Sequence, residues 1–156
     1  MGNATEKTQS RIRFVIDDSI GINLYRGLKE LGCENAAPLR DFYPELRTPD
    51  ETWIPAMSKR GYFLITRDVK LWDKRRQQQM MFDAEAGAFI FDMNNLNRWR
   101  LAQVVIRKWE WMEKMARSLE RPFAFAISPT GHQKRLIPDV SKIRPKRPPR
   151  TAPENS

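Results

Sequence analysis

With 156 residues the chain is long enough for one domain with a substantial buried core, and its single cysteine excludes an internal disulfide framework and favours a reducing, cytoplasmic location. The polar amino terminus and the lack of any apolar run near ~20 residues predict neither a signal peptide nor a membrane span. The formal net charge of +9 favours polyanionic partners through counterion release, and nucleic acid is the leading class of such partners.

The first predicted strand is the apolar run Phe14–Ile16, which follows a polar segment, residues 1–10, that we expect to be disordered. A continuous apolar run is typical of a strand that helices cover on both faces, as in parallel sheets. Asp17 and Asp18 follow this run with no spacer. Because open α/β sheets bind ligands at the carboxyl ends of their strands, the acidic pair marks a candidate site.

Two helical segments are predicted between the first and the second buried strand. Ser19 is placed to cap a helix that ends at Gly32, and residues 36–39 form a short candidate strand. Thr48–Glu51 has the form of a capping box, which would start the second helical segment. Pro55 lies inside that segment, so we expect two short turns there rather than one continuous helix.

The second buried strand, residues 62–66, repeats the pattern of the first, because Arg67 and Asp68 follow it directly. Further along, the pattern predicts a helix over 73–82, a strand over 88–91, a helix over 95–118 and a strand over 123–127. This alternation predicts an α/β fold. We expect residues 11–137 to form an α/β/α sandwich around a central, mostly parallel sheet of about five strands.

The last predicted region is a basic, proline-rich tail, residues 138–156, which we expect to be extended. The stretch from Lys134 to Arg150 holds seven Lys/Arg residues against one Asp, so it carries most of the net positive charge. Binding to a polyanion and simple solubilisation are the two interpretations of such a tail.

Acidic residues at four places could hold a divalent metal: Asp17 with Asp18 beside it, Asp50, Asp68 and Asp73. With one histidine and one cysteine in the chain, any metal must be bound by carboxylates, which points to Mg²⁺ or Mn²⁺. Two such ions about 4 Å apart can promote a displacement at phosphorus. The acids also have structural interpretations, since Asp18 and Asp50 could cap helices and Asp73 could be solvated at a helix start.

At these residues the chain resembles the PIN-domain superfamily, in particular its VapC-type, toxin-like branch. The matching pieces are Phe14–Asp17, Asp50–Ile54, Gly61–Asp68 and Pro122–Ile127. The resemblance implies a PIN-like α/β/α nuclease domain and a ribonuclease that depends on Mg²⁺ or Mn²⁺. In bacteria such proteins are commonly toxins, which an antitoxin encoded beside them neutralises.

Carried over by position, the resemblance implies catalytic and metal-binding roles for Asp17, Asp50 and Asp68. The superfamily usually has a fourth catalytic acid. Asp73 is the first choice for that acid in this sequence, and Glu85 is the second.

Basic residues near Asp68 in the sequence could hold the RNA backbone: Arg67, Lys70, Lys74, Arg75 and Arg76. A solvated helix face is the other interpretation of this group. Trp72 could stack a base or pack in the core. Trp111 could face a partner protein or, in a homodimer, a second copy of the chain.

Two other functions remain open on sequence alone. A catalytically degenerate PIN-like module would keep the fold and bind RNA or protein without cleaving it. Asp17 and Asp18 also resemble the acidic pair of response-regulator receivers. Those proteins need a lysine at the end of a later strand, and no lysine is evident at that place.

Overall fold

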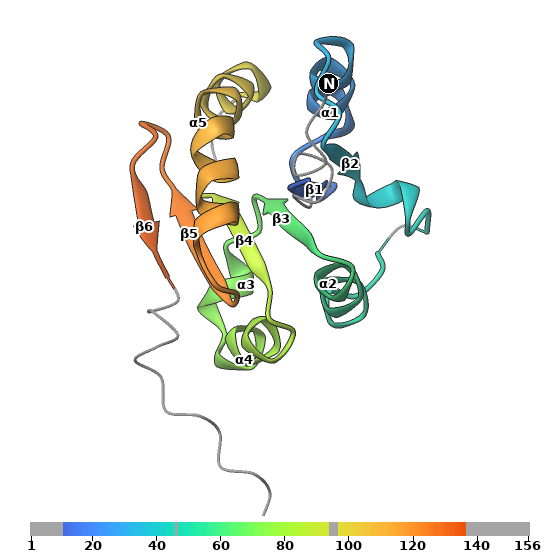
Figure 1. Ribbon diagram of the computed structural model, residues 1–156, viewed down its shortest axis with the longest axis vertical. Coiled ribbons are helices and arrows are strands. Elements are labelled where there is room, and N and C mark those ends of the chain that lie inside the picture. The colour runs from blue at the N-terminus through green and yellow to red at the C-terminus, as the bar shows by residue number, and fades with distance from the viewer. Residues whose placement is uncertain (1–10, 46, 94–96, 137–156) are drawn as a thin grey trace, which may run out of the picture.

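The computed structural model describes residues 11–45, 47–93 and 97–136, so the predicted disordered segment 1–10 and the predicted tail 138–156 lie outside the described residues. In chain order the elements are β1 (Arg13–Ile16), α1 (Ile22–Glu30), β2 (Ala36–Pro38), the 3-10 helix η1 (Leu39–Asp41), α2 (Asp50–Lys59), β3 (Tyr62–Thr66), α3 (Lys70–Asp73), α4 (Arg75–Asp83), β4 (Gly87–Phe91), α5 (Arg98–Ser118), β5 (Phe123–Ile127) and β6 (Gln133–Arg135). They form three layers, with α1 and α5 on one face of the sheet and α2, α3 and α4 on the other (Figure 1).

The sheet has six strands in the order β2-β1-β3-β4-β5-β6. Neighbouring strands are parallel except β5 and β6, which are antiparallel. The prediction of an α/β fold with a mostly parallel sheet is confirmed, with β6 as an extra edge strand. β6 reads Gln-Lys-Arg and is exposed along its length, so no apolar pattern marked it. The strand order reverses between β1 and β3, which is where sheets of this kind bind ligands.

Opposite faces of the strands supply two separate cores. Toward α1 and α5 the sheet presents large aromatic side chains, among them Phe14, Phe89 and Phe123. Toward α2, α3 and α4 it presents smaller ones such as Leu64 and Ala88. Because both faces are covered, the central strands read as the continuous apolar runs from which they were predicted.

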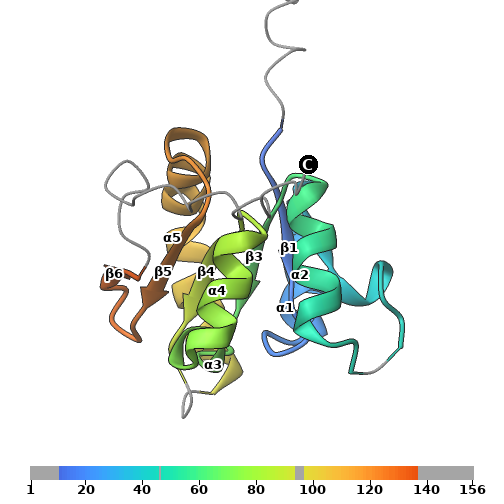
Figure 2. The same cartoon turned by 90° about the horizontal axis from the view of Figure 1, so that it is seen from below.

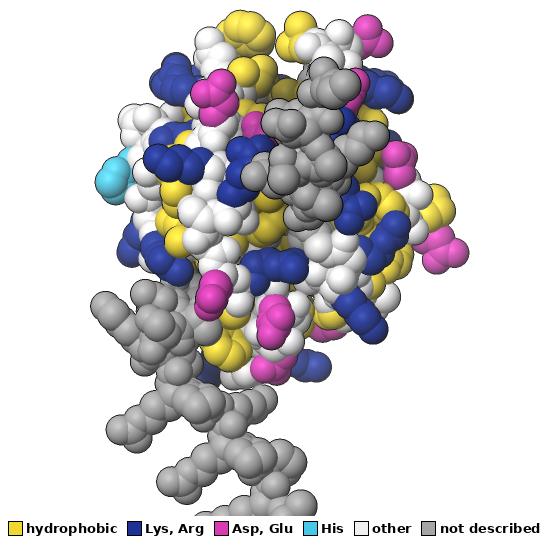
Figure 3. All heavy atoms as spheres, in the orientation of Figure 1, with side chains coloured by type: hydrophobic (Ala, Val, Ile, Leu, Met, Phe, Trp, Pro, Cys, Tyr) yellow, Lys and Arg dark blue, Asp and Glu magenta, His cyan; other side chains and the backbone are white. Residues whose placement is uncertain are grey.

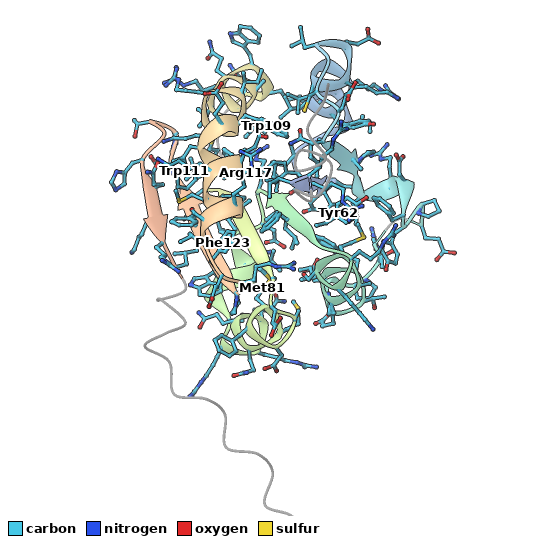
Figure 4. The ribbon with its side chains drawn as sticks, in the orientation of Figure 1. Tyr62, Met81, Trp109, Trp111, Arg117 and Phe123 are labelled. Atoms are coloured by element: carbon cyan, nitrogen blue, oxygen red, sulfur yellow. The ribbon has the colours of Figure 1, made fainter. Side chains whose placement is uncertain are left out.

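Two tryptophans of α5 belong to the aromatic core. Trp109 lies edge-on to Phe14 and Trp111 lies edge-on to Phe125, with ring centroids 5.0 Å apart in both pairs. Figure 4 shows the two rings on opposite sides of α5, Trp109 toward α1 and Trp111 toward β5. The expectation that Trp111 faces a partner is wrong, because its ring packs on the sheet.

The two predicted helix caps are absent. α1 has Gly21 as its N-cap, at φ 98° and without a side-chain hydrogen bond, while the hydroxyl of Ser19 bonds to Asp17 instead. At α2 the hydroxyl of Thr48 donates to a carbonyl of the preceding loop, and no side chain caps the helix. In both places a contact outside the helix replaces the local capping geometry that the sequence predicted.

α2 is one continuous helix although Pro55 lies inside it, so the expected pair of short turns is wrong. Proline removes the hydrogen bond to the carbonyl four residues earlier, which here belongs to Glu51. Glu51 is exposed in the first turn, where water can hydrate that carbonyl. The helix predicted over 73–82 is α4, at residues 75–83, and the short helix α3 before it was not predicted.

α5 is a helix of 21 residues whose amino end is capped by Asn97, since the Asn97 side chain accepts a hydrogen bond from the backbone N–H of Arg100 at 2.9 Å. Its buried residues recur at helical spacing and face the aromatic core: Leu101, Val104, Val105, Met112 and Ala116. Among the helices of the described ranges, none combines the length and apolar character that crossing a membrane requires.

Candidate active site

Three of the predicted acids meet at the carboxyl edge of the sheet. Asp17 follows β1 directly, Asp68 comes two residues after the end of β3, and Asp50 is the first residue of α2. All three line one open hollow of about 530 Å³. Figure 2 shows the cause, because the ends of β1 and β3 and the starts of α2 and α3 lie at the same edge of the molecule.

Asp17 is held by two hydroxyl groups. Its Oδ2 atom accepts a hydrogen bond from Ser19 Oγ at 2.8 Å and another from Thr66 Oγ1 at 2.9 Å. The Asp17 backbone N–H donates to the carbonyl of Ile65 at 3.0 Å, which extends the ladder between β1 and β3 by one residue. Both hydroxyl protons are directed at Oδ2, and within the described residues Oδ1 receives no hydrogen bond. The second oxygen of Asp17 is therefore left for a ligand.

Thr66 also fixes the position of Asp68. This threonine is fully buried at the end of β3, and its hydroxyl oxygen accepts a hydrogen bond from the Asp68 N–H at 3.0 Å. Asp68 Oδ1 in turn accepts from the Lys70 N–H at 3.0 Å, at the start of α3. One buried hydroxyl thus links two acids that lie 51 positions apart in the sequence.

Asp50 is held by the buried Trp53, whose indole N–H donates to Asp50 Oδ1 at 3.0 Å. The pKa of Asp50 is raised above its ordinary value, first because burial disfavours the charged form and then because the charges of Asp68, Asp17 and Glu51 repel it. The hydrogen bond from Trp53 acts in the opposite direction and lowers the pKa. Asp50 is therefore close enough to Asp17 and Asp68 for their negative charges to disfavour its own.

A divalent cation would relieve this repulsion, and the donor set suits one. Carboxylate oxygens are the ligands that Mg²⁺ and Mn²⁺ prefer. In each of Asp17, Asp50 and Asp68, one side-chain oxygen receives no hydrogen bond from the described residues. Within the described ranges no three acids form a ready-made ligand cluster. Binding one ion by all three would thus require their side chains to turn further into the hollow.

Of the basic residues predicted to hold RNA, Arg67 and Lys70 line the hollow. The Arg67 guanidinium also donates to the backbone carbonyl of Met93, which ties the end of β3 to the end of β4. Lys74 and Arg75 are exposed at the start of α4 and are not among the residues that line this hollow.

Arg76 lines a different hollow, which it shares with Pro55 and Met80 between α2 and α4. Trp72 is half-buried and packs against the core below α3 and α4, which favours its structural interpretation. On the face shown in Figure 3, Lys and Arg side chains are spread among acidic ones. The net charge alone therefore does not locate a nucleic-acid surface there.

The other acids differ in where they lie. Asp18 points to Arg40, with Asp18 Oδ1 3.4 Å from Arg40 Nε, and does not line the hollow. Glu85 is exposed just before β4, at the amino edge of the sheet, so it cannot be the fourth acid. The side chain of Asp73 lies outside the described residues, and the role proposed for it stays a prediction.

Sequence reasoning did not assign a role in the site to the hydroxyls of Ser19 and Thr66. Thr66 carried a signal that could have been used, because it is the one polar residue in the apolar strand 62–66 next to an acid. The position of Ser19 instead predicts a helix N-cap, because a serine that precedes a helical pattern commonly has that role.

A family model described as "PIN like domain" matches residues 12–93, which is more than half of the chain. The matched segment runs from β1 through β4 and contains Asp17, Asp50 and Asp68, while α5, β5 and β6 lie beyond it. Comparison with curated proteins and with solved structures gives no match. The receiver interpretation loses support, because Ser128 and Pro129, not a lysine, follow β5.

Proposed function

Because the chain belongs to the PIN-like domain family, whose members generally have a nuclease-type fold, we propose that it is a metal-dependent endoribonuclease that hydrolyses RNA phosphodiester bonds. The observation that carries the proposal is the meeting of Asp17, Asp50 and Asp68 around one hollow, where the charges of Asp17 and Asp68 contribute to the raised pKa of Asp50. Mg²⁺ or Mn²⁺ is the proposed cofactor, because the candidate metal ligands are carboxylates, which these ions prefer.

In this proposal Asp17, Asp50 and Asp68 hold the ion. When bound, a divalent ion polarises a phosphoryl oxygen and lowers the pKa of water. The chain itself orients the ligands: Ser19 and Thr66 fix one oxygen of Asp17, and the indole of Trp53 fixes one oxygen of Asp50. Lys70 lines the same hollow, and its ammonium group is placed to bind a phosphate of the RNA backbone.

RNA cleavage in Mg²⁺ or Mn²⁺ tests this assignment. We expect Asp17→Asn and Asp68→Asn to reduce the cleavage rate by at least about 100-fold, because each removes a charged ligand while keeping the size of the side chain. Asp18→Asn is the matched control, since Asp18 neighbours Asp17 but pairs with Arg40 outside the hollow. Cleavage at the parental rate by both site variants would contradict the enzyme assignment.

A catalytically degenerate binding module is the second candidate, and the absence of a ready-made cluster of three acids among the described residues favours it. Thermal unfolding with and without Mn²⁺ separates the two. A metal at 100 times its Kd should stabilise the protein by about 2.7 kcal/mol. A melting temperature that does not change in millimolar Mn²⁺ would favour the degenerate module.

We also propose that the nuclease acts as the toxin of a toxin–antitoxin pair in the cytoplasm, with the antitoxin as its protein partner. Inhibition of growth on expression in bacteria, lost in Asp68→Asn, is the expected result. Equal growth with the parent and with Asp68→Asn, while RNA cleavage in vitro persists, would remove the toxin role and keep the nuclease.

A further inference from the structure

Trp99 is exposed to an unusual degree for an indole side chain. It lies in the first turn of α5 with 72% of its surface accessible, whereas Trp109 and Trp111 of the same helix pack against the sheet. Ile106, two turns further along the same side of α5, is 48% exposed. A large aromatic surface left in water is available for stacking or for a partner.

The charge around Trp99 is positive. From Arg98 to Lys108 the helix carries four Lys/Arg residues and no Asp or Glu. The amino end of a helix favours acidic side chains, yet the first turn of α5 has none and includes the exposed Arg98 and Arg100 instead. Lys108 is engaged elsewhere, because its ammonium donates to Gln133 at 2.7 Å. The two arginines that flank Trp99 thus interact unfavourably with the helix dipole and are suited to bind an anionic ligand.

The position of this turn connects it with the acidic hollow. Six residues separate the end of β4 from the start of α5, so the first turn of α5 lies at the carboxyl edge of the sheet, where β1 and β3 also end (Figure 2). The hydrogen bond from the Arg67 side chain to the Met93 carbonyl ties the hollow to the segment that leads into α5. A chain of nucleotides leaving the hollow along this edge would meet Trp99 flanked by Arg98 and Arg100.

We infer that Trp99 stacks an unpaired base of an RNA strand whose backbone continues from the acidic hollow past Arg98 and Arg100. This inference rests on the proposed nuclease function and adds to it a base-binding position outside the acidic hollow. A base inside a duplex already has neighbours on both faces, whereas an unpaired base can turn out and stack on an indole. Arginine side chains beside the ring bind the phosphates and add cation–π contact with the base.

Fluorescence anisotropy of a short, labelled single-stranded RNA in EDTA tests the inference, because binding is then measured without cleavage. We expect Trp99→Ala to weaken binding by between about 5-fold and about 100-fold, the range of one base–aromatic stack, and Trp99→Phe to retain most of the affinity. Ile106→Ala is the matched control, since Ile106 is exposed on the same helix about 10 Å further from the edge, and it should bind as the parent does. Annealing the RNA to its complement should remove the effect of Trp99→Ala.

Replacing the bases of the strand one at a time by abasic sites locates the stack. At the stacked position the parent and Trp99→Ala should bind equally well, whereas elsewhere the difference should remain. Parental affinity of Trp99→Ala for single-stranded RNA would overturn the inference. An equal loss in Ile106→Ala would also overturn it, because the effect would then not be specific to the indole ring. Trp99-dependent binding without any cleavage in Mn²⁺ would overturn the proposed nuclease and leave the stacking inference standing.

Discussion

The two edges of the sheet each carry a hollow, and they differ in how their charges are satisfied. The amino-edge hollow is the larger, at about 640 Å³ against about 530 Å³, and Trp109 and Arg117 of α5 are among the residues that line it (Figure 4). Its acids are paired: Glu113 lies 3.6 Å from Arg117, and Glu34 lies 3.9 Å from Arg11.

At the carboxyl edge Asp50 instead lies near two other acids, and its pKa is raised by burial and by the charges of Asp68 and Asp17. Repulsion between like charges raises the free energy of the folded state, and such an arrangement is typical of functional sites. The candidate functional edge is therefore identified by the balance of charges around its hollow, and not by the size of the hollow.

The largest expected effect on stability comes from Thr66, because its buried hydroxyl serves both Asp17 and Asp68. Thr66→Val keeps the shape of the side chain but removes one donor and one acceptor, which should lower the free energy of unfolding by about 1–3 kcal/mol. Urea unfolding measures the change. Thr66→Ser keeps the hydroxyl and is the control, so an equal loss in both variants would show that packing, and not hydrogen bonding, matters at this position.

In metal-free buffer Asp50→Asn is expected to raise the free energy of unfolding, by less than Thr66→Val lowers it. The pKa of Asp50 is raised in the folded protein, so the folded state holds its proton to a higher pH than the unfolded state does. The contribution of Asp50 to stability is therefore full at low pH and is lost as the pH rises through the folded pKa. Asparagine does not ionise and can still accept the hydrogen bond from Trp53.

Melting temperatures of the parent and of Asp50→Asn across the acidic to neutral range check this prediction. The advantage of the asparagine variant should be near zero at low pH and should grow as the pH rises. An advantage that does not change with pH, or a variant that melts lower at neutral pH, would show that the pKa of Asp50 is not raised in the fold.

The smallest effect is expected at the amino edge. Glu113→Gln removes the charge that pairs with Arg117, whose side chain is 62% exposed while that of Glu113 is 23% exposed, and ion pairs at the surface contribute only about 0–1 kcal/mol. We expect little change in the melting temperature and none in RNA cleavage. A large loss of cleavage in Glu113→Gln would mean that the two edges are coupled, and the comparison between them would fail.

The parts of the fold that could be predicted are those whose signal is local and apolar. The runs 14–16 and 62–66 are buried on both faces, so their sequence alone identifies strands and places an acid after each. Leu31 shows the limit of periodicity, because α1 ends at Glu30 and Leu31 is 79% exposed although it continues the helical pattern. Where a helix ends depends on tertiary contacts, which cannot be deduced from the spacing of apolar residues alone.

The candidate site shows the same limit. That acids follow two strands could be predicted, and Asp50 could be named as a further candidate at the start of a predicted helix, a role that the family resemblance supported. That Ser19 bonds to Asp17 could not, because tertiary contacts hold the Ser19 hydroxyl: its oxygen accepts a hydrogen bond from the backbone N–H of Arg67 at 3.0 Å and lies 3.3 Å from Thr66 Oγ1. Local capping statistics assign Ser19 to the helix that follows it, whereas the tertiary hydrogen bond places it in the site.

Titration of Mn²⁺ into the protein, followed by the electron paramagnetic resonance signal of the free ion, tests the central claim most directly. The account predicts that the parent binds Mn²⁺ and that Asp17→Asn, Asp50→Asn and Asp68→Asn each weaken binding by at least about tenfold. Asp18→Asn and Glu113→Gln should bind as the parent does, because neither residue lines the acidic hollow. Binding of Mn²⁺ that is unchanged in all three site variants would contradict the claim that these acids share one cation.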